Sequence, residues 1–168
     1  TEEGKEGYYI NYYDLKGDKY YYRKSGVKMD QAFKRIRLET PRTESGKTAK
    51  YLSPAESGLF PFFPNKIIQA YLKNQQVKTL WFVEGEKKAL KASACGAWIV
   101  GLPGIHGFVD KETNRLLPDI VKLIKGLQVE NIGFLHDADA MVLKFQKDKD
   151  LTQRPKSFAS SVTSFLEA

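Results

Sequence analysis

The chain has 168 residues, 42% of them hydrophobic, which allows one globular domain or two small ones and does not indicate disorder. Lysine and arginine number 27 against 20 acidic residues, and the net charge of +7 favours an anionic partner such as nucleic acid. One cysteine excludes an internal disulfide, and two histidines leave no usual zinc-ligand set. A reducing, cytoplasmic location is therefore expected.

No apolar run approaches the roughly 20 residues of a membrane span, so no membrane partner is expected. The chain begins TEEGKEG, without an initiator methionine or a signal-peptide pattern. This start suggests a piece cut from a longer protein.

Residues 1–63 are predicted to form a β-rich N-terminal region. Four stretches have the composition of short strands, namely GYYINYY, KYYYRKS, AFKRIRLE and KYLSP, with the polar turns DLKGD and PRTESGKT between them. They predict a small antiparallel sheet. The segment SGLFPFFP follows, and because its two prolines lack N–H donors we expect irregular structure and a domain boundary there.

Residues 64–168 alternate between helical and strand patterns. The expected order is helix NKIIQAYLKNQ, strand TLWFVEG, helix EKKALKASAC, strand AWIVGLPG, helix LLPDIVKLIKGL, strand ENIGFLHD and helix KSFASSVTSFLEA. Parallel neighbours need a crossover connection, and right-handed crossovers place helices against the sheet. The fold class is therefore α/β, with a parallel sheet covered by helices on both faces.

Carboxylates fall where two of these strands end. Glu84 ends the first strand, and Asp137 and Asp139 follow the third in FLHDADA. Ligands bind at the carboxyl ends of parallel strands, and in an extended chain residues two apart point the same way. Carboxylates that face one crevice repel one another unless a cation lies between them, and oxygen ligands suit Mg²⁺ or Mn²⁺. The alternative for each acid is a helix or turn cap.

The order of these signals resembles a known catalytic fold. A strand ending in Glu-Gly, a helix, a second strand ending near a glycine and a third ending in Asp-x-Asp resemble the TOPRIM domain of bacterial primases, topoisomerases and some nucleases. EGEKKA, GLPG and the late D-x-D resemble the branch found in primase-like replication proteins of phages, plasmids and other mobile elements. The resemblance covers about Val77 to Ala168 and implies a TOPRIM-like, Rossmann-like sheet.

The resemblance implies roles for particular residues. Glu84 matches a general acid or base of phosphoryl transfer, Asp137 and Asp139 match a metal-binding pair, and all three would lie at a Mg²⁺ or Mn²⁺ site. Gly85 would allow a tight turn beside the site, and Gly101 and Gly104 match small residues after the second strand. Two departures leave the number of metals open. Lys88 stands where bacterial primases usually carry another acid, and further acids on a later strand are not found.

Several cations near these acids could bind nucleic acid or a nucleotide. Lys87 and Lys88 could hold a triphosphate or a template phosphate, or they could be ordinary helix-surface lysines. Lys144 and Lys147 belong to LKFQKDKDLTQRPK, which is either a solvated loop or a segment that binds phosphates beside the site. Backbone next to Gly85 and Gly104 could approach a phosphate closely.

Seven of the nine tyrosines lie between Tyr8 and Tyr22, interleaved with Lys19, Arg23 and Lys24. Such tyrosines can stack on single-stranded bases, but packing of a small β layer explains them as well and is the favoured interpretation.

The two histidines flank the predicted site. His106 follows GLPGI and could touch substrate, whereas His136 would point away from Asp137 in an extended strand and is given no catalytic role.

The expected function is nucleotidyl transfer that makes an RNA primer on single-stranded DNA from nucleoside triphosphates, next to a helicase domain or protein. A TOPRIM nuclease is the enzymatic alternative, because both reactions use in-line attack at phosphorus. A degenerate nucleic-acid-binding module attached to a helicase is the third.

Overall fold

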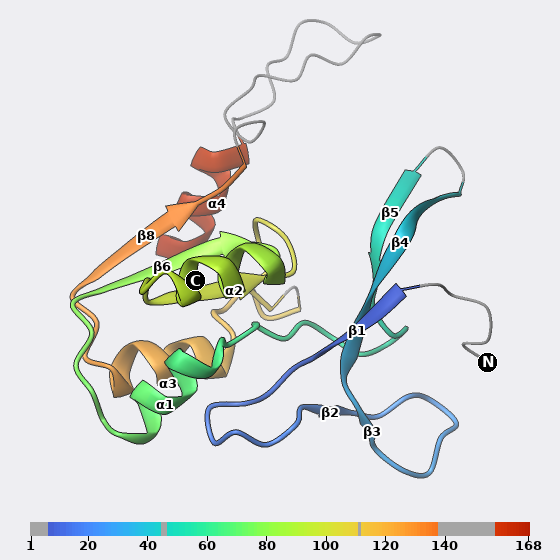
Figure 1. Cartoon of the computed structure of the whole chain (residues 1–168), viewed down its shortest axis with the longest axis horizontal. Coiled ribbons are helices and arrows are strands. Elements are labelled where there is room, and N and C mark those ends of the chain that lie inside the picture. Colours follow the sequence, from blue (N-terminus) through green and yellow to red (C-terminus); the bar gives the residue numbers. More distant parts are fainter. Residues whose placement is uncertain (1–6, 45–46, 111, 138–156) are drawn as a thin grey trace, which may run out of the picture. The chain divides into compact units, whose positions relative to one another are not determined.

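The structure is a computed structural model that describes residues 7–44, 47–110, 112–137 and 157–168 (Figure 1). The chain divides into two compact units, Thr1–Gly58 and Leu59–Ala168. The division lies inside the SGLFPFFP segment.

The N-terminal unit is antiparallel. Strands β1 (Gly7–Asn11), β4 (Lys34–Glu44) and β5 (Lys47–Leu52) form one sheet in the order β1-β4-β5, and β2 (Tyr21–Tyr22) pairs with β3 (Gln31–Ala32) in a short ribbon. The predicted small antiparallel sheet is confirmed.

The predicted polar turn PRTESGKT is mostly strand. β4 continues through Glu44, β5 begins at Lys47, and the register between them shifts between Arg37 and Arg42. The hydroxyl oxygens of Thr43 and Thr48 lie 3.1 Å apart across the pair. β-Branched threonines favour strands, and this preference extends the hairpin into residues expected to be a loop.

The N-terminal tyrosines divide into two groups. Tyr12 is fully buried with its ring edge-on to Phe33, the centroids 4.9 Å apart, and Tyr20 is also buried. Tyr8, Tyr9 and Tyr21 keep 43%, 48% and 57% of their surface exposed. Packing in the core therefore accounts for Tyr12 and Tyr20 but not for the three exposed rings.

The C-terminal unit contains the predicted parallel sheet. Strands β6 (Thr79–Glu84), β7 (Ile99–Leu102) and β8 (Asn131–Leu135) lie in the order β7-β6-β8, so β6 is central. Both of its neighbours are parallel to it. The helices are α1 (Asn65–Leu72), α2 (Glu86–Ala94), α3 (Pro118–Gly126) and α4 (Ser157–Glu167).

Helices pack on both faces of this sheet. On one face, Phe165 of α4 packs against Phe82 of β6 and Phe134 of β8, with ring centroids 5.6 Å and 5.3 Å apart. On the other, a Cβ added to Gly101 of β7 would lie 3.1 Å from Ala89 of α2. A glycine at 101 thus allows α2 to approach the sheet closely.

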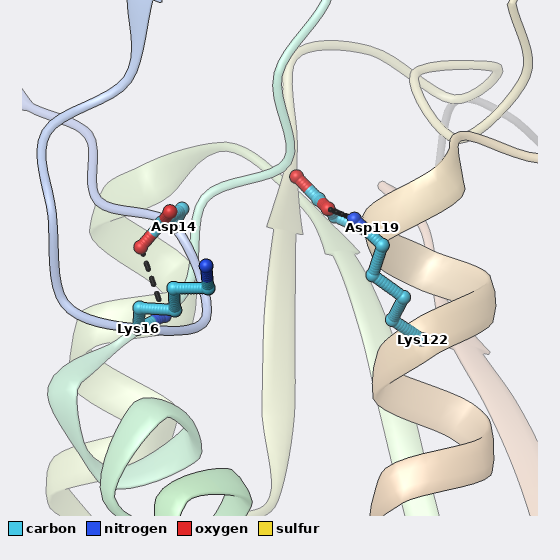
Figure 2. A network of polar contacts seen from close by, with 4 residues as sticks. All are labelled: Asp14, Lys16, Asp119 and Lys122. Atoms are coloured by element: carbon cyan, nitrogen blue, oxygen red, sulfur yellow. Dashed lines mark hydrogen bonds and ion pairs between the residues drawn. The ribbon is translucent and has the colours of Figure 1, made fainter.

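The ends and surfaces of the helices follow local rules. α3 begins with Pro118, whose missing N–H is not needed in a first turn, and Lys122 Nζ lies 3.0 Å from Asp119 Oδ1 one turn away (Figure 2). None of the helices in the described part of the chain combines the length and apolarity that crossing a membrane requires.

Candidate active site at the carboxyl edge of the parallel sheet

Strand register brings the ends of β6, β7 and β8 to one edge. Glu84, the last residue of β6, pairs with Leu102 on β7, and Val83 pairs with Leu135 on β8. Asp137 follows β8 by two residues, so Glu84 and Asp137 leave neighbouring strands at the same edge. Although 53 positions of sequence separate them, parallel pairing brings the two residues to the same edge of the sheet.

Asp137 forms an ion pair with the first turn of α2. Its Oδ1 accepts a hydrogen bond from Lys88 Nζ, and both side chains are about half exposed, at 51% and 48%. An exposed pair of this kind contributes only about 0.2–1 kcal/mol to folding. The main consequence of the pair is that the Lys88 ammonium lies against Asp137, the carboxylate that was expected to bind a metal.

A glycine turn sends the chain from Glu84 into α2. Gly85 has φ 94° and ψ 142°, a region that side chains rarely adopt, and its N–H donates to Leu102 O at 2.9 Å. This turn places the N-terminus of α2, with Lys87 and Lys88, beside the strand ends. Lys87 is exposed there, and Glu84 is partly exposed.

Glu86 is a third carboxyl group near this edge, and the sequence pattern did not single it out. It is the first residue of α2 and only 1% exposed, in contrast to the partly exposed Glu84 two positions earlier. An acid in a first helical turn interacts favourably with the helix dipole. The available signal was the second glutamate of EGE, at the start of a helical pattern.

The loop after β7 is compact. Gly107 N–H donates to Gly104 O at 2.9 Å, and a Cβ added to Gly107 would lie 2.5 Å from Pro103 Cδ. A Cβ added to Gly104 would meet nothing within 4 Å, so this part of the loop is open. His106 is exposed in the same loop.

Ser161 of α4 joins this loop to His136, the residue that follows β8. His136 Nε2 lies 3.0 Å from the hydroxyl of the fully buried Ser161, and that hydroxyl donates to Ile105 O at 2.5 Å. Because a serine hydroxyl has one proton, His136 Nε2 is the donor in the first bond. Burial lowers the pKa of His136, the charge of His106 lowers it further, and Asp137 partly opposes this. Ser161 was not predicted, since nothing in its local sequence marks it.

Other predicted site residues lie outside the described residues. These are Asp139, Lys144 and Lys147. Within residues 7–44, 47–110, 112–137 and 157–168, no three His, Cys, Asp or Glu side chains gather as a metal site. The described part therefore contributes Glu84 and Asp137 of the predicted ligand set.

Replacing Gly85 by alanine is expected to destabilise the chain by about 1–3 kcal/mol, because a Cβ is strained at this φ and ψ. Urea unfolding measures the loss. Gly104→Ala is the matched control and is expected to be nearly neutral, because its Cβ enters open space. Equal stability of the two variants would contradict the strained turn.

Comparisons with known proteins give one match, which is to a family model. No curated protein and no solved structure matches the chain. A family model described as "Domain of unknown function (DUF3854)" matches residues 68–161, which run from α1 into α4 and include both Glu84 and Asp137. Because this match covers more than half of the chain, the protein belongs to the DUF3854 family.

Proposed function

We propose that the chain is a TOPRIM-like domain of a cytoplasmic, mobile-element replication protein that catalyses nucleotidyl transfer on nucleic acid, with RNA primer synthesis as its reaction. The observation that carries the proposal is the register of β6 and β8, which brings Glu84 and Asp137 to one sheet edge. Acids at the carboxyl ends of parallel strands, beside a helix N-terminus, suit phosphate chemistry.

Two of the described residues carry the kind of oxygen donor that a divalent cation prefers. Glu84 and Asp137 offer hard oxygen donors, and Asp137 already accepts the cationic head of Lys88. A bound Mg²⁺ or Mn²⁺, held by Asp137, Asp139 and Glu84, would neutralise charge on the transferring phosphoryl group.

Side chains and backbone of the chain would transfer the proton and bind the phosphates. Glu84 is partly exposed and suited to take a proton from the attacking hydroxyl. Lys87 and Lys88, on the first turn of α2, are suited to hold the triphosphate or the template. The backbone at Gly85 and Gly104 has no side chain to keep phosphate oxygens away.

One observation favours a second candidate, a catalytically degenerate nucleic-acid-binding module working beside a helicase. Lys88 stands where a further acid is expected and pairs with Asp137, so a lysine ammonium already supplies the positive charge there. A site neutralised in this way has less need of a metal.

One assay separates these candidates from each other and from a nuclease. The full chain is incubated with single-stranded DNA, nucleoside triphosphates, and Mg²⁺ or Mn²⁺. New or extended strands support the primase, shortened strands indicate the nuclease, and binding without turnover indicates the module.

Replacing Lys88 by alanine is expected to strengthen Mn²⁺ binding by about three- to tenfold, because the competing charge on Asp137 is lost. The affinity is measured by titration with Mn²⁺ alone, without nucleic acid. Lys91→Ala, an exposed lysine later in α2, is the matched control for net charge. If both variants bind Mn²⁺ like the original chain, Lys88 does not compete with a metal.

A further inference from the structure

The N-terminal unit contains an open groove of about 880 Å³. Its walls come from the end of β1, the β2–β3 ribbon, β4 and the chain leaving β5, all within this unit. It is therefore a feature of the N-terminal unit itself, separate from the residues at the edge of the parallel sheet.

The groove is cationic. Lys19, Lys24 and Lys34 line it from three different segments, and none of the described residues that line it is acidic. Two acids in the adjoining loops bond elsewhere: Asp30 Oδ1 lies 2.7 Å from Arg23 Nε, and Glu56 Oε2 accepts a hydrogen bond from the backbone N–H of Ser25 at 2.9 Å. The lining of the groove, as far as the structure describes it, therefore contains three lysines and no carboxylate.

The groove also presents an aromatic ring. Tyr22 donates its hydroxyl proton to Gln31 Oε1 at 2.9 Å, and its ring stands edge-on to Phe33, so the ring is held in place. Lys34 Nζ lies 3.8 Å from the centre of the Tyr9 ring, which restricts that lysine in turn. Groups that are already fixed lose less conformational entropy when a ligand binds.

Apolar side chains complete the lining. Ile36 of β4, Leu52 of β5 and Val27 of the β2–β3 connection line the same groove. Dispersed cations together with an aromatic ring and apolar surface match what unpaired nucleotides need, since phosphates contact the lysines and bases contact the ring. The paired bases of a duplex are stacked inside it and cannot reach such a ring.

We propose that this groove binds single-stranded nucleic acid, with Lys19, Lys24 and Lys34 on its phosphates and Tyr22 stacked on a base. The inference rests on the proposed function in one respect, namely that the bound strand is the template. The prediction that the groove binds a single strand depends only on the groove's own residues and does not require the chain to be an enzyme.

The test measures binding of a fluorescent oligothymidylate to the full chain in EDTA, where metal-dependent turnover is absent. The groove variant replaces Lys19, Lys24 and Lys34 by glutamine. The control variant makes the same lysine-to-glutamine change at three lysines that are exposed in the same unit and do not line the groove, namely Lys16, Lys28 and Lys50. Lys16 lies in a turn where its backbone N–H donates to Asp14 (Figure 2).

We expect the groove variant to bind at least tenfold more weakly and its logarithmic salt slope to fall by about 2, since three phosphate contacts are lost. The control variant should bind nearly as the original chain does. Tyr22→Leu should weaken binding of the single strand by roughly tenfold. The weak binding of the corresponding duplex should stay unchanged. If the triple variant does not fold, as judged by circular dichroism, the single change Lys24→Glu in the loop after β2 replaces it.

Equal losses in the groove and control variants would overturn the proposal, because they would show diffuse attraction to the basic chain. Ready displacement of the strand by a nucleoside triphosphate would assign the groove to free nucleotide and also overturn it. Substituting an oligouridylate tests whether the strand is DNA or RNA, and groove-dependent binding of either supports the proposal.

Failure of this proposal is distinguishable from failure of the proposed function. If the chain binds the strand through the groove but neither synthesises nor cleaves strands, the groove proposal is supported and the proposed enzymatic function is wrong. If the chain synthesises strands but the groove variant binds the strand normally, the proposed function is supported and the groove proposal is wrong.

Discussion

Replacing Glu84 by glutamine is expected to lower the rate of primer synthesis by at least about 100-fold, because a positioned general acid or base contributes roughly 10²–10⁴ in rate. Glutamine keeps the size of the side chain but cannot accept the proton of the attacking hydroxyl. Asp137→Asn should cause a loss of similar size through weakened metal binding. Rates of nucleotide incorporation on a single-stranded template give the measurement.

The matched control is Glu130→Gln, which makes the same change at an exposed glutamate just before β8, at the opposite end of that strand. It should retain full activity. Thermal unfolding of all three variants checks that they remain folded. Normal turnover by folded Glu84→Gln would remove Glu84 from the chemistry, and normal turnover by Asp137→Asn would remove the metal role of that residue.

Much of the C-terminal unit follows from its hydrophobic pattern. Short apolar runs such as Leu80 to Val83 and Ile99 to Leu102 are typical of buried strands, and amphipathic segments lie between them. Parallel pairing then places Glu84 and Asp137 at one edge, because every strand of such a sheet ends on the same side. The strands, the helices and the position of these two acids at one sheet edge were therefore predictable.

The contacts within the site were not predictable in the same way. Lys88 and Asp137 are brought together by the angle at which α2 leaves Gly85, and this angle depends on packing of Ala89 against Gly101. The bond between His136 and Ser161 likewise depends on how α4 packs on the sheet. Contacts of this kind depend on three-dimensional packing, and residue type alone does not specify the partner.

The N-terminal unit shows a different limit. The composition of GYYINYY predicted a strand, but it could not decide which tyrosines are buried, because both faces carry tyrosine. The structure buries Tyr12 and leaves Tyr9 exposed over Lys34. The groove was not predictable for a related reason, since its lysines come from segments whose relative positions depend on the β1–β4 and β2–β3 pairings.

Phe82 should be the most sensitive core position of the parallel sheet, and Phe82→Ala is expected to cost about 3–5 kcal/mol of folding free energy. Its side chain is fully buried on the central strand, with its ring centroid 5.8 Å from that of Phe134 and 5.6 Å from that of Phe165. Alanine would leave a cavity between the sheet and α4, because β6 is fixed by strands on both sides and cannot move to fill it.

Urea unfolding of the full chain measures this loss, and Leu90→Ala supplies the control. Leu90 lies on α2 with 49% of its surface exposed, so its truncation should change stability by no more than about 0.5 kcal/mol. Phe82 precedes Glu84 by two residues on the same strand. Looser packing of Phe82 should therefore also leave Glu84 less firmly held in position. A cost below about 1 kcal/mol for Phe82→Ala would mean that α4 does not cover this face of the sheet as described.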